Sequence, residues 1–285
     1  MKRAIIVYNP WKAQAKWELD LLSRFIEGKG VSCTALRSDR ITQVKNIAAF
    51  SKYDTCITLG GDGTILRVAE QAAFTGVPVL GINLGSLGFL SEFESDEIYD
   101  ALDKIIKGNY RIEKRLLLDI TAPSLGKNKK FTAVNDCVLR YGPSGRVILL
   151  RLKVNGSTVA DYIGDGLIVA TPTGSTAYSL AAGGPIIHPG VAVFAVTPIC
   201  PHTLSQRALV VSCDEELCIE LPEYKSNTDV MLSIDGQRNY KFAAGSEVTI
   251  KKSAKYLKLI TDPKKGYFEI LRKKLGWGSV PGKTA

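Results

Sequence analysis

The sequence feature that most constrains the fold is a glycine turn between an apolar run and an amphipathic segment. Residues 60–64 read Gly-Gly-Asp-Gly-Thr and follow the largely apolar run Asp54–Leu59. In residues 65–74, apolar side chains recur at helical spacing, which is not the pattern of a returning strand. The Asp-Gly dipeptide alone would also suit a hairpin turn. Its context instead predicts a strand, a tight turn and a helix in succession.

A turn of this composition suits a phosphate group. Glycines let backbone amides approach an anion without a Cβ in the way. A helix that opens near Thr64 would add its unpaired amides and its positive dipole end. Asp62 needs another explanation, because a carboxylate repels phosphate. It is explained if Asp62 accepts the proton of a hydroxyl group that is being phosphorylated, or if it binds a metal.

Two common nucleotide motifs do not account for this turn. The third glycine of the dinucleotide fingerprint is replaced by Leu66, and the Gly-Lys-Ser/Thr ending of a P-loop is absent. A second glycine turn, Asn83–Phe89, follows the next predicted strand. Ligands of open α/β sheets bind at the carboxyl ends of the strands. The two turns are therefore expected to line one pocket.

Residues 1–108 alternate strand and helix patterns, which predicts a Rossmann-like parallel sheet with helices. Strands are expected at 3–8, 31–36, 54–59 and 77–82, and helices at 17–26, 42–50, 65–74 and 95–108. A helical pattern at 266–274 is expected to return to this α/β domain, which residues 262–285 would complete.

From residue 109 the pattern changes to short β-rich runs separated by turn residues. Strands are expected at 111–121, 131–141, 146–154, 167–171, 191–197, 216–221 and 230–234. Residues 109–261 are therefore expected to form a second, all-β domain of sandwich-like architecture.

Composition narrows the class of partner. The net charge of +9 suits a polyanionic partner, but the basic clusters are not interleaved with the aromatic side chains that single-stranded nucleic acids need. The apolar stretch at the N-terminus is too short for a signal peptide, and later apolar runs are shorter than a membrane span. We therefore expect no nucleic acid, no membrane and a cytoplasmic location. The six cysteines lie apart and are expected to be reduced core residues.

A hydroxyl-rich segment interrupts the β-rich region. It begins after Gly164-Asp165-Gly166, and six of the nine residues from 171 to 179 carry a hydroxyl group. A plain polar loop is one interpretation. However, hydroxyls, backbone amides and one aromatic ring at a helix start also suit a nucleotide, because they can bind ribose and phosphate and stack against a base.

At this point the sequence resembles the NAD kinase family over most of its length. The resemblance is carried by residues 60–64, 81–90, 135–136, 164–166, 171–179, 183–189, 197–205 and 233–237. The Gly-Gly-Asp-Gly-Thr turn is shared with diacylglycerol, sphingosine and 6-phosphofructokinase-like kinases. The hydroxyl-rich segment and Asn135-Asp136 are what select the NAD kinase branch.

The resemblance implies transfer of the terminal phosphoryl group of ATP to the adenosine ribose 2′-hydroxyl of NAD, giving NADP and ADP. Such an enzyme is a phosphotransferase with an alcohol acceptor. Asp62 would be the catalytic base, and Gly60, Gly61 and Thr64 would form the phosphate loop. The implied substrate-binding residues are Gly63, Phe89, Asn135, Asp136, Arg146, Asp165, Thr173, Thr176, Ala177, Tyr178, Ser179, Leu180, Ala181 and Gln237.

The family also implies a divalent cation, Mg²⁺, bound with ATP and without an assigned side-chain ligand, and assembly as a homodimer or homotetramer. Two alternatives remain at this point. A lipid kinase could use the same glycine turn, and a non-catalytic dinucleotide sensor could keep the binding residues without turnover.

Overall fold

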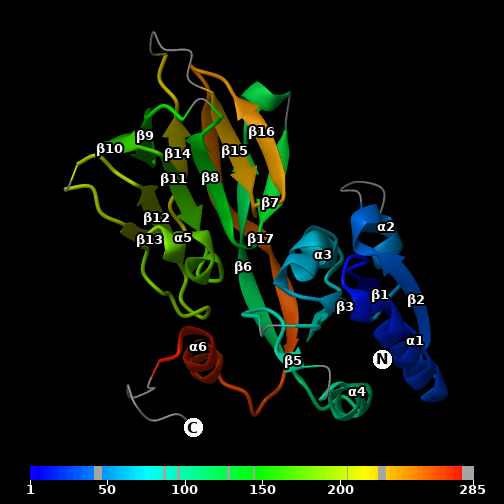
Figure 1. Cartoon of the computed structure of the whole chain (residues 1–285). Helices are drawn as coiled ribbons and strands as arrows, with labels where there is room; N and C mark the ends of the chain where they lie inside the picture. The colour runs from blue at the N-terminus through cyan, green and yellow to red at the C-terminus, as the bar shows by residue number, and fades with distance from the viewer. Residues whose placement is uncertain are drawn as a thin grey trace. The chain divides into compact units, whose positions relative to one another are not determined.

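The computed structural model describes residues 1–41, 47–85, 88–94, 97–126, 129–143, 145–203, 205–223 and 229–277. The chain forms two compact units, one of Met1–Lys114 with Leu257–Ala285 and one of Arg115–Tyr256 (Figure 1). Both boundaries fall inside strands, β6 (Arg111–Thr121) and β17 (Glu247–Thr261). The chain therefore passes between the units within regular structure and without a separate linker.

The first unit is built on a parallel sheet with the strand order β2-β1-β3-β4. These strands are β1 (Arg3–Tyr8), β2 (Ser32–Arg37), β3 (Thr55–Gly60) and β4 (Val79–Asn83). The short strand β5 (Phe93–Glu94) and the end of β17 also pair with β4 in parallel. Every residue of β3 and β4 is buried, as is typical of a parallel sheet that is covered on both faces.

Helices connect and cover these strands. They are α1 (Ala13–Gly28), η1 (Ser38–Arg40), α2 (Ile47–Phe50), α3 (Asp62–Thr75), α4 (Ile98–Ile106) and α6 (Tyr267–Leu275). In α1, the buried Leu19, Leu22 and Ile26 share one face, whereas Trp17 is 62% exposed. Residues 42–46 of the helix expected at 42–50 and residues 86–87 of the second glycine turn lie outside the described residues.

The strand order creates a switch point between β1 and β3. From β1 the chain leads through α1 to β2 on one side, whereas from β3 it leads through α3 to β4 on the other. The two connections therefore diverge at the carboxyl ends of adjacent strands. In open α/β sheets, ligands bind in the crevice at such a point. The Gly-Gly-Asp-Gly-Thr turn lies at one side of this crevice, directly after β3.

The second unit contains two layers of antiparallel strands. One sheet has the order β13-β12-β11-β8-β15-β16, and the order β10-β9-β14-β17 runs through the other, to which β6 and β7 also belong. The strands are β7 (Lys130–Ala133), β8 (Asp136–Tyr141), β9 (Ile148–Val154), β10 (Ser157–Gly164), β11 (Gly166–Ala170), β12 (Val193–Ile199), β13 (Leu209–Ser212), β14 (Leu217–Glu220), β15 (Val230–Ile234) and β16 (Arg238–Phe242). Short helical segments are η2 (Pro123–Leu125), η3 (Gly174–Thr176) and α5 (Tyr178–Ala181).

One core fills the space between these layers. Leu139 and Val169 from the first sheet share a cluster with Leu152, Ile219 and Ile250 from the second. Alternate residues on β8 and β11 point to the opposite face, where Val138 and Ile168 belong to a smaller cluster. This alternation is the signature of a sandwich. The expected combination of an α/β unit and an all-β sandwich is thus confirmed.

Several element boundaries differ from the sequence-based expectation. Helix α3 begins at Asp62 and not near Thr64. The single strand expected at 131–141 is two strands, β7 and β8, because the chain turns at 134–135. Strand β10 was missed because most of its residues are polar or exposed, which hides the periodicity of a buried face. Among the described residues, no helix is long and apolar enough to cross a membrane.

A substitution at Gly81 in β4 tests the packing behind the two glycine turns. A Cβ there would lie 2.5 Å from Ile65 Cδ1 and 3.0 Å from Ser91 Cα. We expect Gly81→Ala to lower the free energy of unfolding by about 1–3 kcal/mol, because overpacking forces neighbouring groups to move. Urea unfolding measures this change. Gly28→Ala is the control, because its Cβ would meet no atom within 4 Å, and an equal loss in both variants would contradict the packing.

Candidate active site

The carboxylate of Asp62 is held by the second glycine turn. Its Oδ2 accepts a hydrogen bond from the Phe89 amide at 2.7 Å. Its Oδ1 accepts three, from the Leu90 amide at 3.2 Å and from the amide and hydroxyl of Ser91 at 3.1 and 2.9 Å. These donors give the side chain one orientation at the start of α3, so the two turns form one structural unit.

The distribution of these bonds leaves one oxygen available. A carboxylate offers about four acceptor positions over its two oxygens. Among the described residues, three donors bind Oδ1, whereas only the Phe89 amide binds Oδ2. Oδ2 is therefore the atom that can accept a hydrogen bond from a hydroxyl group of a ligand.

Gly88 makes this contact possible. A Cβ at residue 88 would lie 1.9 Å from Asp62 Oδ1 and 2.2 Å from Ser91 Oγ. No side chain fits there, so the glycine of the second turn is explained by the acid of the first. Gly60 is explained in the same way, because its Cβ would lie 2.1 Å from Thr64 Oγ1.

Gly61 and Gly63 have a different explanation. The φ angle of Gly61 is −153°, which is extended backbone that any residue can adopt. Its Cβ would have only ordinary contacts, and that of Gly63 would meet no atom within 4 Å. Both glycines therefore leave open space beside the start of α3, which has no side-chain cap. Open space beside the positive end of a helix is what an anion needs.

Lys12 belongs to this site although the sequence interpretation missed it. Its Nζ donates hydrogen bonds to the carbonyl oxygens of Leu84 at 2.9 Å and Gly60 at 3.4 Å. Lys12 is also the N-cap residue of α1, at the switch point. The sequence feature that could have indicated a role for Lys12 was its position just after the first strand. Lys12 is separated from its two partners by 72 and 48 residues, so no local motif contains it.

The second unit has a cavity of about 410 Å³ on one side of its six-stranded sheet. Four of the expected substrate-binding residues line it, namely Asn135, Asp136, Ala177 and Tyr178. The other lining residues were not predicted and are Val138, Arg140, Ser233, Asp235, Gly236 and Asn239. Tyr178 is 42% exposed at the start of α5, so its ring is accessible to a ligand.

Asp235 organises one wall of this cavity. Its carboxylate accepts hydrogen bonds from the amides of Val134, Asn135 and Asp136 at 2.9, 2.7 and 3.1 Å. The residue is partly exposed as a whole, but its carboxylate is surrounded by protein atoms, and this burial raises its pKa. Asp235 thereby fixes the backbone that carries Asn135. Residues 233–237 carry part of the family resemblance, but no role was predicted for Asp235. The φ of Asp235, 52°, fits an aspartate in a turn.

Asp136 is the second acid in this wall. Burial, and then the nearby negative charge of Asp235, raise the pKa of Asp136 to about 7. Its side chain is 3% exposed, so the charged form loses most of its hydration. Asp136 therefore changes charge near neutral pH, unlike an ordinary aspartate.

Four of the six hydroxyl groups in residues 171–179 bond to protein atoms and stabilise the segment itself, the Thr176 hydroxyl through Thr173 O. The Thr171 hydroxyl donates to Val134 O, and the Ser175 hydroxyl donates to Pro172 O at 2.6 Å. The Ser179 hydroxyl is buried against Thr197 Oγ1 at 2.9 Å. A Cβ on Gly174 would lie 2.0 Å from Asn135 O, so the segment packs directly on the backbone of Asn135.

The remaining expected residues lie outside the lining of the cavity. Among these, Thr173 is buried and accepts a hydrogen bond from the Thr176 hydroxyl, and Leu180 and Ala181 are on α5. Asp165 lies between β10 and β11 beside the Cys200 thiol, whose pKa it raises.

Three more expected residues sit apart. Arg146 is exposed in the connection from β8 to β9, and Gln237 follows Gly236 in the turn from β15 to β16. In the first unit, the ring of Phe89 lies 4.9 Å from the Lys274 ammonium.

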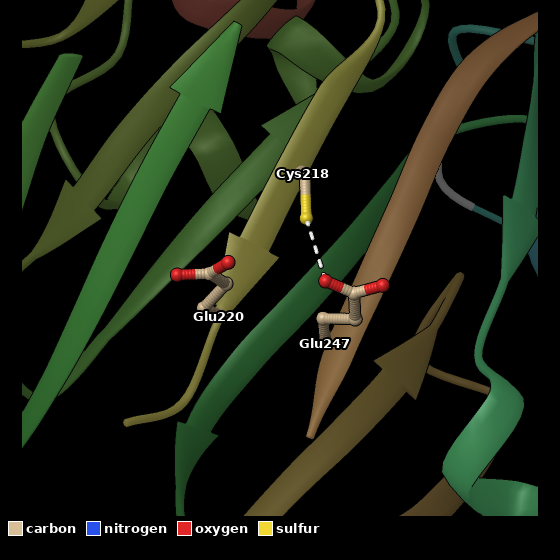
Figure 2. A group of neighbouring side chains, drawn as sticks. All are labelled: Cys218, Glu220 and Glu247. Atoms are coloured by element: carbon tan, nitrogen blue, oxygen red, sulfur yellow. Dashed lines mark hydrogen bonds between the residues drawn. The ribbon is translucent and has the colours of Figure 1, made fainter. Parts of the chain in front are cut away.

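A thiol and two carboxylates form a possible metal-binding group away from the cavity lining (Figure 2). Cys218 and Glu220 lie on β14 and Glu247 lies on β17, with one ligand atom of each within 4.8 Å of the others. However, Glu220 is already paired with Lys153. The Cys218 thiol donates to Glu247, and burial with the two carboxylates raises its pKa to about 11. These contacts explain the group without an ion.

The expectation that all cysteines are core residues is only partly correct. All six are free, and Cys56, Cys137 and Cys213 are buried. Cys200 is exposed, because it follows β12 in a turn with a φ of 42°, and the two others are half-buried.

Two family models match this chain. The model of the ATP-NAD kinase N-terminal domain matches residues 11–110, and that of the ATP-NAD kinase C-terminal domain matches residues 134–261. The NAD kinase of Caldanaerobacter subterraneus subsp. tengcongensis is 47% identical over 230 residues, which are 79% of this chain and 80% of that protein. The NAD kinase of Geotalea daltonii is 42% identical over 253 residues, 88% of this chain and 85% of that protein.

Two solved structures have a similar fold. Yeast NADH kinase complexed with NADH has a TM-score of 0.88 and 24% identity, and the match covers all of this chain (100%) and 90% of that one. An NAD kinase from Archaeoglobus fulgidus in complex with ATP has a TM-score of 0.79 and 24% identity over 96% of this chain and 98% of that one.

The raised pKa of Asp136 predicts a pH dependence of stability. The folded chain binds this proton more tightly than the unfolded chain, in which an aspartate has a pKa of about 3.9. Its contribution is therefore complete below about pH 4 and is lost as the pH rises through about 7. We expect the wild type to lose stability relative to Asp136→Asn between about pH 4 and pH 7, as measured by urea unfolding. Parallel pH profiles of the two proteins would contradict this.

Proposed function

This chain belongs to the NAD kinase family, and we propose that it transfers the terminal phosphoryl group of ATP to the adenosine ribose 2′-hydroxyl of NAD, giving NADP and ADP. The observation that carries the proposal is the Asp62 carboxylate, which is held by four donors beside an open, amide-lined turn. The relatives favour NAD kinase activity over the lipid kinase and sensor interpretations. The reaction belongs to NADP biosynthesis.

Asp62 acts as the general base in this proposal. Its Oδ2 accepts the proton of the 2′-hydroxyl as the ribose oxygen forms a bond to the terminal phosphorus of ATP. The bond from that phosphorus to the bridging oxygen breaks, and ADP leaves. Phosphoryl transfer depends mainly on positioning and charge stabilisation. Asp62 would therefore contribute to catalysis mainly through the fixed orientation of its carboxylate. The contacts to residues 89–91 supply that orientation.

The cavity of the second unit is proposed to bind the dinucleotide. Tyr178 offers an exposed ring for stacking against adenine, and Asn135 and Asp136 offer polar groups in the same cavity. Since the Thr171, Ser175 and Ser179 hydroxyls are engaged internally, the contribution of Ser179 would come through its backbone. The roles of Phe89, Arg146, Asp165, Thr173, Thr176, Ala177, Leu180, Ala181 and Gln237 remain proposals from the family resemblance.

A divalent cation, Mg²⁺, is proposed to accompany ATP. Its charge would neutralise the phosphate oxygens during transfer. The residues near the turn fit such a hydrated ion, because the buried Oδ1 of Asn83 has no hydrogen-bond partner within the described residues and, near Gly61, could accept a hydrogen bond from one of its waters. A neutral oxygen suits an ion that keeps several of its waters.

We further propose a cytoplasmic location and assembly as a homodimer or homotetramer. The six free cysteines suit a reducing compartment. The assembly is carried over from the family resemblance, and sedimentation of the purified protein measures it directly.

Asp62→Asn tests the base. We expect wild-type protein with NAD, ATP and Mg²⁺ to form NADP, and we expect the variant to lose about 10²–10⁴-fold in kcat with little change in the Kd of NAD. An NADP-specific dehydrogenase gives the readout. Asp20→Asn on the exposed side of α1 is the matched control. A near-normal kcat in Asp62→Asn would refute the assignment, and a wild type that binds NAD without turnover would be a sensor.

Gly63→Ala separates stability from function. Its Cβ would meet no atom within 4 Å and Gly63 lies in α3, so alanine should raise the free energy of unfolding by up to about 1 kcal/mol. The same methyl group would occupy the space that we assign to the ribose. We expect a more stable protein with a higher KM for NAD. A variant that is both more stable and fully active would show that the ribose does not approach Gly63.

A further inference from the structure

A polar space lies over Gly61 in the first unit. Among the described residues outside its chain neighbours, the atoms nearest to the Cβ that Gly61 lacks would be Asn83 Oδ1 at 3.9 Å and Lys12 Nζ at 4.0 Å. A hydrogen-bond donor and an acceptor thus flank the same open point. A ligand that enters this space would meet both of them.

Lys12 is held there by backbone oxygens and not by an acid. Its ammonium donates to Leu84 O and Gly60 O, one carbonyl from each glycine turn. An ammonium has three N–H donors. No ion pair is recorded for Lys12 within the described parts of the chain, so its charge is not neutralised by a carboxylate. The third N–H and the whole positive charge are therefore available to a ligand.

Asn83 supplies a second and independent indication. It is 2% exposed at the carboxyl end of β4, where it pairs with Gly60 of β3. Its Nδ2 donates to Gly85 O at 3.1 Å, which fixes the direction of the amide. Its Oδ1 is buried and has no hydrogen-bond partner among the described residues. Because a buried oxygen without a partner is unfavourable, something that fills the space over Gly61 is expected to donate to it.

The surrounding backbone favours an anion in the same place. Helix α1 has Lys12 as its N-cap and α3 has Gly61, and neither helix has a side-chain cap. Both positive helix ends therefore lie at the switch point between β1 and β3. Asp62, which follows Gly61 in the chain, directs its carboxylate to the amides of residues 89–91.

We propose that Lys12 and Asn83 form a subsite over Gly61 for the phosphate chain of the phosphoryl donor. Lys12 contacts a phosphate oxygen, and Asn83 Oδ1 accepts a hydrogen bond from a water molecule that accompanies the phosphate. This subsite deepens the proposed function and rests on it for the identity of the donor as ATP. It makes Lys12 a determinant of donor affinity and not of NAD affinity.

Calorimetric titration with ATP in the absence of NAD tests the subsite. We expect Lys12→Met to raise the Kd of ATP about ten- to hundred-fold, the usual effect of losing a hydrogen bond to a charged group. The Kd of NAD should change less than about two-fold, within the scatter expected of surface changes. Lys16→Met is the matched control, since Lys16 is exposed one turn further along α1. Equal ATP binding by Lys12→Met and wild type would overturn the proposal.

A second variant guards against a merely structural role of Lys12. Gly61→Ala meets no clash and needs no strained φ, so it should keep the wild-type Tm while its methyl group fills the space. We expect it to weaken ATP binding as well. If Lys12→Met lowers the Tm and weakens ATP and NAD equally, while Gly61→Ala binds ATP normally, Lys12 only braces the turns and the subsite is wrong.

The binding readout separates this proposal from the proposed function. If Lys12→Met weakens ATP binding but the wild type makes no NADP, the subsite stands and the kinase reaction is refuted. If the wild type makes NADP but Lys12→Met binds ATP equally well, the reaction stands and the subsite is refuted.

Discussion

The contact on which the first unit depends is that of the Asp62 carboxylate with the amides of residues 89–91. It joins the end of β3 to the loop that follows β4. Gly88 lacks a side chain because the carboxylate fills that place, and Gly81 lacks one because Ile65 and the backbone of Leu90 and Ser91 pack on it. Lys12 joins the same two turns from the side of α1. The acid is thus positioned by the fold before any substrate arrives.

The second unit also contains a carboxylate that is bound by successive backbone amides. Asp235 accepts hydrogen bonds from three successive amides and so positions Asn135, as Asp62 is itself positioned by three successive amides. The two acids differ in what they leave available. Asp62 retains an oxygen with one donor, which suits proton transfer, whereas the Asp235 carboxylate is enclosed and serves the cavity wall. In the proposed function, Asp62 acts on the ligand and Asp235 holds the residues that bind it.

The sequence predicts those features that depend on local pattern. The succession of β3, turn and α3 follows from glycine spacing and apolar periodicity. Asn135, Asp136, Ala177 and Tyr178 were expected from the family resemblance instead, and they line one cavity. The roles of Lys12 and Asp235 could not be predicted in this way, because their partners are backbone atoms 48 to 101 residues away in the chain, which no motif marks. The hydroxyl-rich segment was interpreted as a ligand surface, yet Thr171, Ser175 and Ser179 stabilise the segment itself. Local composition does not distinguish a hydroxyl that binds a ligand from one that satisfies a carbonyl.

The most direct test of the central claim is a crystal structure of the protein with NAD and a non-hydrolysable ATP analogue. We expect the 2′-hydroxyl oxygen of the adenosine ribose to lie about 2.6–3.2 Å from Asp62 Oδ2, in line with the terminal phosphorus of the analogue. Oδ1 should keep its bonds to Leu90 and Ser91. A structure in which a different hydroxyl approaches Asp62, or in which the carboxylate leaves the second turn to bind a metal ion, would contradict its role as the base.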